Sequence, residues 1–110
     1  MALFQGLLDR EGRVLDKADR LVKSGFAALE ADASGRATVA FVKALEILQA
    51  QEPAARIEDF QDAYATVGSG LLRVGRIESA QTAATHALAA NAGNLRALGL
   101  QGDILLAQER

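Results

Sequence analysis

His86 is the first residue to consider for chemistry, because it is the sequence's single histidine. A general base needs a second group within hydrogen-bonding reach. On a helix, that group would stand three or four residues away. The sequence has Thr82, Ala83, Ala89 and Ala90 at those positions. We therefore expect His86 to be a surface or partly buried side chain rather than a catalytic one.

An acidic cluster formed by Glu58, Asp59 and Asp62 is the second candidate, because neighbouring carboxylates can hold a divalent cation. The calcium-loop pattern is absent, however, and carboxylates on one exposed helix usually face water. The sequence also contains no cysteine, which excludes disulfides, thiol nucleophiles and cysteine-bound zinc. We expect no metal, no cofactor and no catalytic residue, so the protein is predicted not to be an enzyme.

Two glycine-containing strings, 34–36 and 68–70, are the remaining candidates, and neither is a phosphate loop. Neither ends in Lys followed by Ser or Thr, and neither follows a strand. We expect the string 68–70 to serve close packing inside a helix. Nucleic-acid binding is not expected, because 12 basic residues stand against 14 acidic ones. The basic residues between 10 and 23 alternate with acids, and the pairs Asp16–Arg20 and Asp19–Lys23 suit a solvated helix face.

Helices are the elements expected to position these residues, because the chain has one Pro and its apolar residues recur at steps of three and four. The predicted helices are Arg13–Ala31, Ala37–Ala50, Ala54–Val74, Ile77–Ala90 and Leu95–Glu109. Gly12 is expected to separate the first of them from a short sixth helix in Met1–Arg10. Ser34 and Asn94 are expected to cap the second and the fifth helix.

Three glycines at matching places in similar strings indicate an internal repeat. Gly68 and Gly102 are 34 residues apart, whereas Gly25 precedes Gly68 by 43 residues. Small residues follow the first two glycines at the same distance; they are Ala37 and Ala44 in one string, and Ala80 and Ala87 in the other. Small side chains at all these positions would let paired helices approach closely.

These strings resemble the tetratricopeptide repeat (TPR) family over about residues 18–110. The resemblance implies an all-α fold of stacked antiparallel helical hairpins, with five to six helices and a C-terminal closing helix. The single domain, 1–110, would comprise an apolar N-terminal segment (1–12), two hairpins (13–53 and 54–92) and the closing helix (94–110). The sequence departs from the family where Leu21 and Leu98 replace the aromatic residue that appears as Tyr64. An up-down bundle and an orthogonal bundle also fit the helix pattern.

The resemblance implies a concave groove lined by the first helix of each hairpin and by the closing helix. The partner-binding residues placed there are Val22, Lys23, Phe26, Leu29, Ala65, Ser69, Leu72, Arg73, Leu100 and Leu106. The same helices would add Asp19, Asp62, Thr66, Arg96, Gly99 and Asp103. Family members that hold the acidic tails of heat-shock chaperones need Lys and Asn at such sites, and Val22, Phe26 and Ser69 stand here instead. The groove is predicted to suit an amphipathic helix or an extended apolar peptide. The alternative is that its apolar residues form the core of a closed bundle.

Four apolar residues near the N-terminus have no place in the repeats: Leu3, Phe4, Leu7 and Leu8. They could cap the open end of the stack, enter its groove, or enter the groove of a second copy in a homodimer.

The leading hypothesis is a non-catalytic protein–protein interaction module that takes a protein or peptide and no nucleic acid. A self-assembling structural or scaffold subunit, or a small secretion-type chaperone, is the alternative. No apolar run approaches the ~20 residues of a membrane span, and no targeting signal stands out. We therefore expect a cytoplasmic location.

Overall fold

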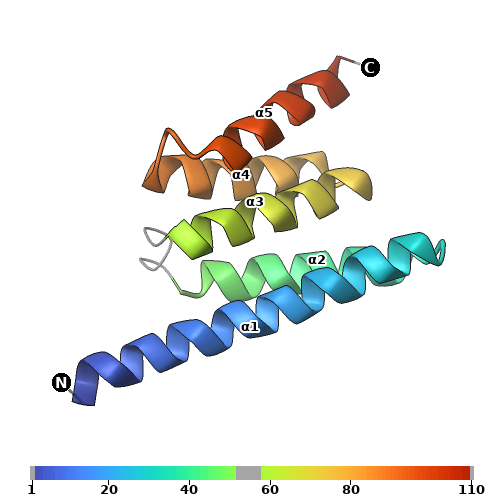
Figure 1. Cartoon of the computed structure of the whole chain (residues 1–110). Helices are drawn as coiled ribbons and strands as arrows, with labels where there is room; N and C mark the ends of the chain where they lie inside the picture. Colours follow the sequence, from blue (N-terminus) through green and yellow to red (C-terminus); the bar gives the residue numbers. More distant parts are fainter. Residues whose placement is uncertain (1, 52–57, 110) are drawn as a thin grey trace.

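The computed structural model describes residues 2–51 and 58–109, with side chains described from residue 12 onward. The chain is all-α, as the sequence predicts. Its helices are α1 (Ala2–Glu30), α2 (Ser34–Gln49), α3 (Glu58–Arg73), α4 (Ile77–Ala90) and α5 (Leu95–Gln108). Consecutive helices pack antiparallel to one another (Figure 1).

The five helices form two layers. α1 packs against α2, and α3 packs against α4. α3 also contacts both helices of the first pair, and α5 contacts both helices of the second. In Figure 1, α1, α3 and α5 lie toward the viewer, with α2 and α4 behind them. The Cα extents of 51 × 30 × 17 Å agree with a slab that is two helices thick.

Alanines let the rear helices pack closely against their partners. The buried alanines of α2 and α4 are Ala37, Ala40, Ala44, Ala80, Ala83, Ala84 and Ala87. They include all four that the sequence marks as small packing positions. The largest fully buried side chains are Tyr64, Phe41 and Phe60, so a few aromatic rings fill the space between the close helices.

Glycines allow close approach at the centre of the molecule. A Cβ atom on Gly25 would stand 2.7 Å from ring carbon Cε1 of Phe41, and one on Gly70 would stand 2.5 Å from Cζ of the same ring. A Cβ on Gly68 would stand 3.2 Å from the Cβ of Ala83. The predicted packing roles of Gly25 and of the string 68–70 are confirmed. The prediction for Gly102 is wrong, because this residue is exposed and a Cβ there would have no neighbour within 4 Å.

The turn from α1 to α2 begins at Asp32, whose φ of 57° lies in the left-handed region. The Ala33 N–H then reaches back to the Ala28 carbonyl at 2.8 Å, which completes a Schellman motif. This tight exit starts α2 at Ser34, with Ala33 as the N-cap and no side-chain cap bond. The prediction that Ser34 caps α2 is therefore wrong. Gly75, with φ 83°, ends α3 in the same way.

Asn94 caps α5, as predicted. Its Oδ1 accepts from the Ala97 N–H at 2.9 Å. Its Nδ2 donates to Gln61 Oε1 at 3.3 Å and to Asp62 Oδ1 at 3.2 Å. This single buried side chain therefore fixes the start of α5 against α3.

The expected break at Gly12 is wrong, since α1 runs without interruption through that residue. A glycine in a helix costs about 1 kcal/mol relative to alanine, which is too little to end a helix whose later turns pack on two neighbours. The expected start of the third helix at Ala54 lies outside the described residues. The homodimer prediction for Leu3, Phe4, Leu7 and Leu8 falls on side chains that also lie outside them.

Candidate functional site

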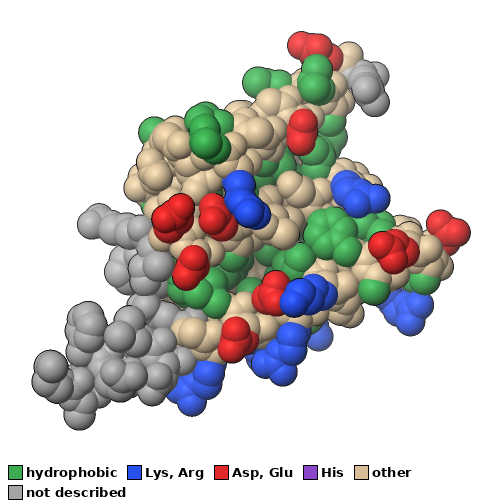
Figure 2. Space-filling view, viewed as in Figure 1, with side chains coloured by type: hydrophobic (Ala, Val, Ile, Leu, Met, Phe, Trp, Pro, Cys, Tyr) green, Lys and Arg blue, Asp and Glu red, His purple; other side chains and the backbone are tan. Residues whose placement is uncertain are grey.

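Two adjoining hollows open on the face that α1, α3 and α5 share. The first lies between α1 and α3 and has a volume of about 390 Å³. The second lies between α3 and α5 and has a volume of about 280 Å³. Thr66 of α3 lines both, so the hollows meet there. Figure 2 shows this face, with hydrophobic side chains between α1 and α3 and charged ones along both helices.

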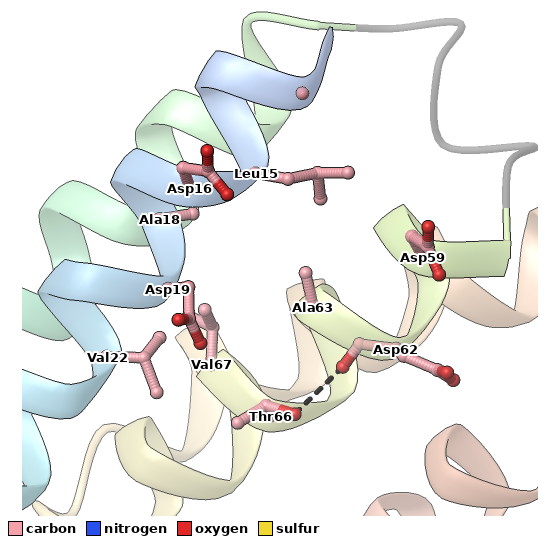
Figure 3. A pocket seen from close by; sticks show the side chains of 11 residues that line it. Leu15, Asp16, Ala18, Asp19, Val22, Asp59, Asp62, Ala63, Thr66 and Val67 are labelled. Carbon is pink, nitrogen blue, oxygen red and sulfur yellow. Dashed lines mark hydrogen bonds between the residues drawn. The ribbon is translucent and has the colours of Figure 1, made fainter.

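The first hollow has an apolar floor. Ala18 and Val22 from α1 and Val67 from α3 are buried at its base. Leu15 and Ala63, both half-buried, stand above them, and Figure 3 shows Leu15 directed from α1 into the space before α3. Such a surface gains free energy when another apolar group covers it.

The axes of α1 and α3 diverge toward the N-terminal ends of both helices (Figure 1). Toward their C-terminal ends, α1 and α3 are joined through Phe26, which contacts both Phe41 of α2 and Arg73 of α3. The rings of Phe26 and Phe41 meet edge to face, with centroids 5.0 Å apart at 69°. The Arg73 guanidinium lies 5.7 Å from the centroid of the Phe26 ring, within cation–π range. Phe26 and Arg73 therefore bridge α1 and α3 beyond the hollow.

The second hollow is more polar. Its apolar lining comes from Ala65 and Leu100, which are buried, and from Leu95, which is exposed. Polar or charged side chains complete it: Thr66, Ser69, Arg96 and Asp103. Arg96 Nε lies 4.0 Å from Asp62 Oδ1. This distance is long for an ion pair and the Arg96 side chain is largely exposed, so the pair adds little to stability.

The structure brings four of the ten predicted partner-binding residues into the hollows. Val22 lines the first, and Ala65, Ser69 and Leu100 line the second. Lys23 is exposed on α1 and pairs with Asp19 at 2.9 Å.

The other predicted partner-binding residues lie outside both hollows. Phe26 and Arg73 form the bridge described above. Leu29 and Leu72 are half-buried and pack against the core. Leu106 is exposed on α5 and lines neither hollow.

Sequence reasoning found Val22 but missed the rest of the apolar lining of the first hollow. Leu15 and Ala18 belong to the same apolar stripe of α1 as Val22, but the resemblance placed only later residues in the groove. Extending that stripe toward the N-terminus by steps of three and four would have found them. Ala63 and Val67 of α3 offered the same signal.

His86 is half-buried, as predicted. Its ring stacks on Tyr64 with centroids 5.1 Å apart and 8° between the planes. The Gln49 Nε2 atom lies 3.4 Å from His86 Nε2. Elsewhere in the described part of the chain, no three His, Cys, Asp or Glu side chains gather as a metal site would require.

Comparison with known proteins gives no relative: no family model, curated protein or solved structure matches the chain. Among the helices that the structure describes, none combines the length and apolarity needed to cross a membrane.

Proposed function

We propose that the chain is a non-catalytic protein–protein interaction module with a TPR-like stack of helical hairpins. Its α1, α3 and α5 face would bind an apolar or amphipathic peptide segment. One observation carries this proposal: the two hollows lie on either side of α3 and share Thr66, so one face of three helices carries both. A hollowed face of this kind, with apolar and polar lining, suits a peptide that buries one side.

Equivalent packing in the two hairpins supports the TPR-like part of the proposal. In the first hairpin, Gly25 of α1 lies against Phe41 of α2. In the second, Gly68 of α3 lies against Ala83 of α4 and, more closely, against Leu100 of α5. Each glycine thus admits the second helix of its own hairpin. α5 then packs on α3 and α4 in the position that the first helix of a third hairpin would take.

The experiment is to select peptides from a random displayed library and to measure their binding to two arginine variants. Thr66→Arg would place a long charged side chain where the two hollows meet. Thr82→Arg on α4 is the matched control, because it is also a helical threonine whose Oγ1 donates to the carbonyl four residues earlier. Circular dichroism and the thermal midpoint of both variants are compared with the wild type first.

We expect selected peptides to be apolar or amphipathic, to bind the wild type and Thr82→Arg alike, and to bind Thr66→Arg at least about tenfold more weakly. Selected peptides that bind a folded Thr66→Arg variant as tightly as the wild type would refute the proposal. The same conclusion would follow if selection enriched no apolar or amphipathic sequence.

A second candidate function, self-assembly, is favoured by the outer face of α5. Four leucines there are exposed: Leu95 by 83%, Leu98 by 45%, Leu105 by 52% and Leu106 by 59%. Their spacing places them within about 100° of the helix circumference, opposite the buried Ala97 and Ile104. An apolar stripe of this width is typical of a helix face that packs on another element.

Sedimentation velocity over a range of concentrations tests self-assembly. If the α5 stripe joins copies of the chain, Leu105→Glu would lower the mass of the assembly. Val39→Glu on α2 is the control, because Val39 is a comparably exposed apolar residue (56%) on another helix. A wild-type protein that stays monomeric at all concentrations would exclude this candidate.

A further inference from the structure

The hollow between α1 and α3 differs from the second hollow in combining an apolar floor with acidic edges. Four carboxylates line it: Asp16, Asp19, Asp59 and Asp62. An apolar surface beside charges of one sign concentrates their field, because its walls have a low dielectric constant. A basic ligand would interact with those carboxylates that have no partner within the protein.

Two of the carboxylates are already engaged within the protein. Asp19 Oδ2 lies 2.9 Å from Lys23 Nζ on the same helix. Asp62 accepts from Asn94 Nδ2 at 3.2 Å, and Figure 3 shows its side chain directed away from α1. Both carboxylates therefore already have a partner within the protein.

Asp16 and Asp59 are the two carboxylates of this hollow that no other described residue engages. They stand on opposite sides of the hollow (Figure 3), are exposed, and make no ion pair with another described residue. The expected pair between Asp16 and Arg20 is not formed; instead Arg20 Nε lies 3.5 Å from the backbone oxygen of Asp16. Asp59 lies in the first turn of α3, where the helix dipole favours a negative charge. Asp16 lies in the middle of α1 and has no such stabilisation.

We infer that this hollow binds a peptide segment in which an apolar side chain is flanked by Lys or Arg; the inference rests on the peptide-binding function proposed above. The apolar side chain covers Leu15, Val22 and Ala63, and the basic groups approach Asp16 and Asp59. Acidic segments are repelled from the same edges. Charge thus selects the ligand, and apolar burial supplies most of its binding energy.

The test uses three fluorescent amphipathic peptides with one leucine pattern, in which the polar positions are all Lys, all Gln or all Glu. Each is titrated by anisotropy against the wild type and against the double variant Asp16→Asn/Asp59→Asn. The control is Glu46→Gln/Glu78→Gln, which removes the same charge from exposed sites on α2 and α4; Glu78, like Asp59, lies in the first turn of its helix. A further variant, Ala63→Phe, fills the hollow without changing its charge.

We expect the Lys peptide to bind best and the Glu peptide least. Asp16→Asn/Asp59→Asn weakens the Lys peptide about fivefold, as two exposed ion pairs would, and leaves the Gln peptide unchanged. Salt at about 500 mM removes most of that difference. The control variant binds like the wild type, whereas Ala63→Phe weakens both the Lys and the Gln peptides.

Several results overturn the inference. If the three peptides bind equally and Ala63→Phe weakens them all, the groove binds peptides without charge selection, so the inference fails while the proposed function stands. If the control variant loses as much affinity as Asp16→Asn/Asp59→Asn, the attraction comes from the net charge of the whole protein. If no peptide binds up to about 1 mM, both proposals fail. If sedimentation shows a dimer that Asp16→Asn/Asp59→Asn dissociates, the occupant is a second copy of the chain.

Discussion

Replacing Gly70 by alanine is expected to destabilise the protein, although alanine is the better helix former. The Phe41 ring is fully buried between two helix backbones, with Gly25 on one side and Gly70 on the other. A Cβ on Gly70 would stand 2.5 Å from Cζ and 2.6 Å from Cδ1 of that ring. The ring cannot move away toward α1, because it already lies in close contact with the backbone at Gly25.

The magnitude follows from two opposing terms. Overpacking a well-packed core costs about 1–3 kcal/mol, and a ring held on both sides belongs at the upper end of that range. Alanine recovers about 1 kcal/mol of helix propensity. The net loss for Gly70→Ala is therefore about 2 kcal/mol. With an unfolding entropy of about 0.23 kcal/mol/K for 110 residues, this lowers the thermal midpoint by about 9 °C.

Gly102→Ala is the control, because a Cβ there meets nothing within 4 Å. Its free energy of unfolding should rise by about 1 kcal/mol, which raises the thermal midpoint by about 4 °C. Thermal and urea unfolding followed by circular dichroism measure both variants. A double-mutant cycle with Phe41→Leu tests the cause: the smaller side chain should relieve Gly70→Ala, with a coupling energy of at least about 1 kcal/mol. A stabilising Gly70→Ala, or a coupling energy near zero, would refute the reasoning.

Three further substitutions should change the free energy of unfolding, measured in urea, each for a different structural reason. Gly68→Ala should cost less than Gly70→Ala, because its new methyl group meets the end of the Leu100 side chain, which can turn into the second hollow; an equal loss would contradict this. Asp32→Gly should raise the free energy of unfolding by about 1 kcal/mol, since glycine adopts a positive φ without strain. An unchanged urea midpoint would contradict this prediction. Asn94→Ala should cost about 2 kcal/mol, because α5 loses its cap to the Ala97 N–H and its link to α3. A loss of less than about 0.5 kcal/mol in the free energy of unfolding of Asn94→Ala would contradict this prediction.

The helices were largely predictable, because local signals decide their periods and most of their ends. The range Ile77–Ala90 was predicted as observed, since a glycine turn precedes it and an asparagine-rich turn follows it. Gly12 shows where local signals fail. A glycine destabilises a helix by about 1 kcal/mol relative to alanine, and the packing of α1 on its neighbours outweighs this cost. Ser34 shows a second limit. Its role depended on whether Asp32 would take a left-handed conformation, which the sequence alone did not reveal.

The site was less predictable than the fold, because it depends on which side chains meet across helices. The sequence pointed to Asp59 as part of an acidic cluster and to Asp16 as half of a helical ion pair with Arg20. Neither observation places the two carboxylates on one hollow, since they are 43 residues apart and come together only where α1 and α3 diverge.

The aromatic bridge explains why α1 and α3 can diverge at one end without losing contact. Phe26, Phe41 and Arg73 join the helices near their C-terminal ends, at the level where Gly25 and Gly70 admit the Phe41 ring. Close contact there fixes the angle between α1 and α3, and the angle leaves the N-terminal halves apart. The hollow is thus a consequence of how the two glycines pack. Gly70→Ala, which alters that packing from a distance, should therefore change peptide affinity at Asp16 and Asp59 as well as stability, whereas Gly102→Ala should change stability alone.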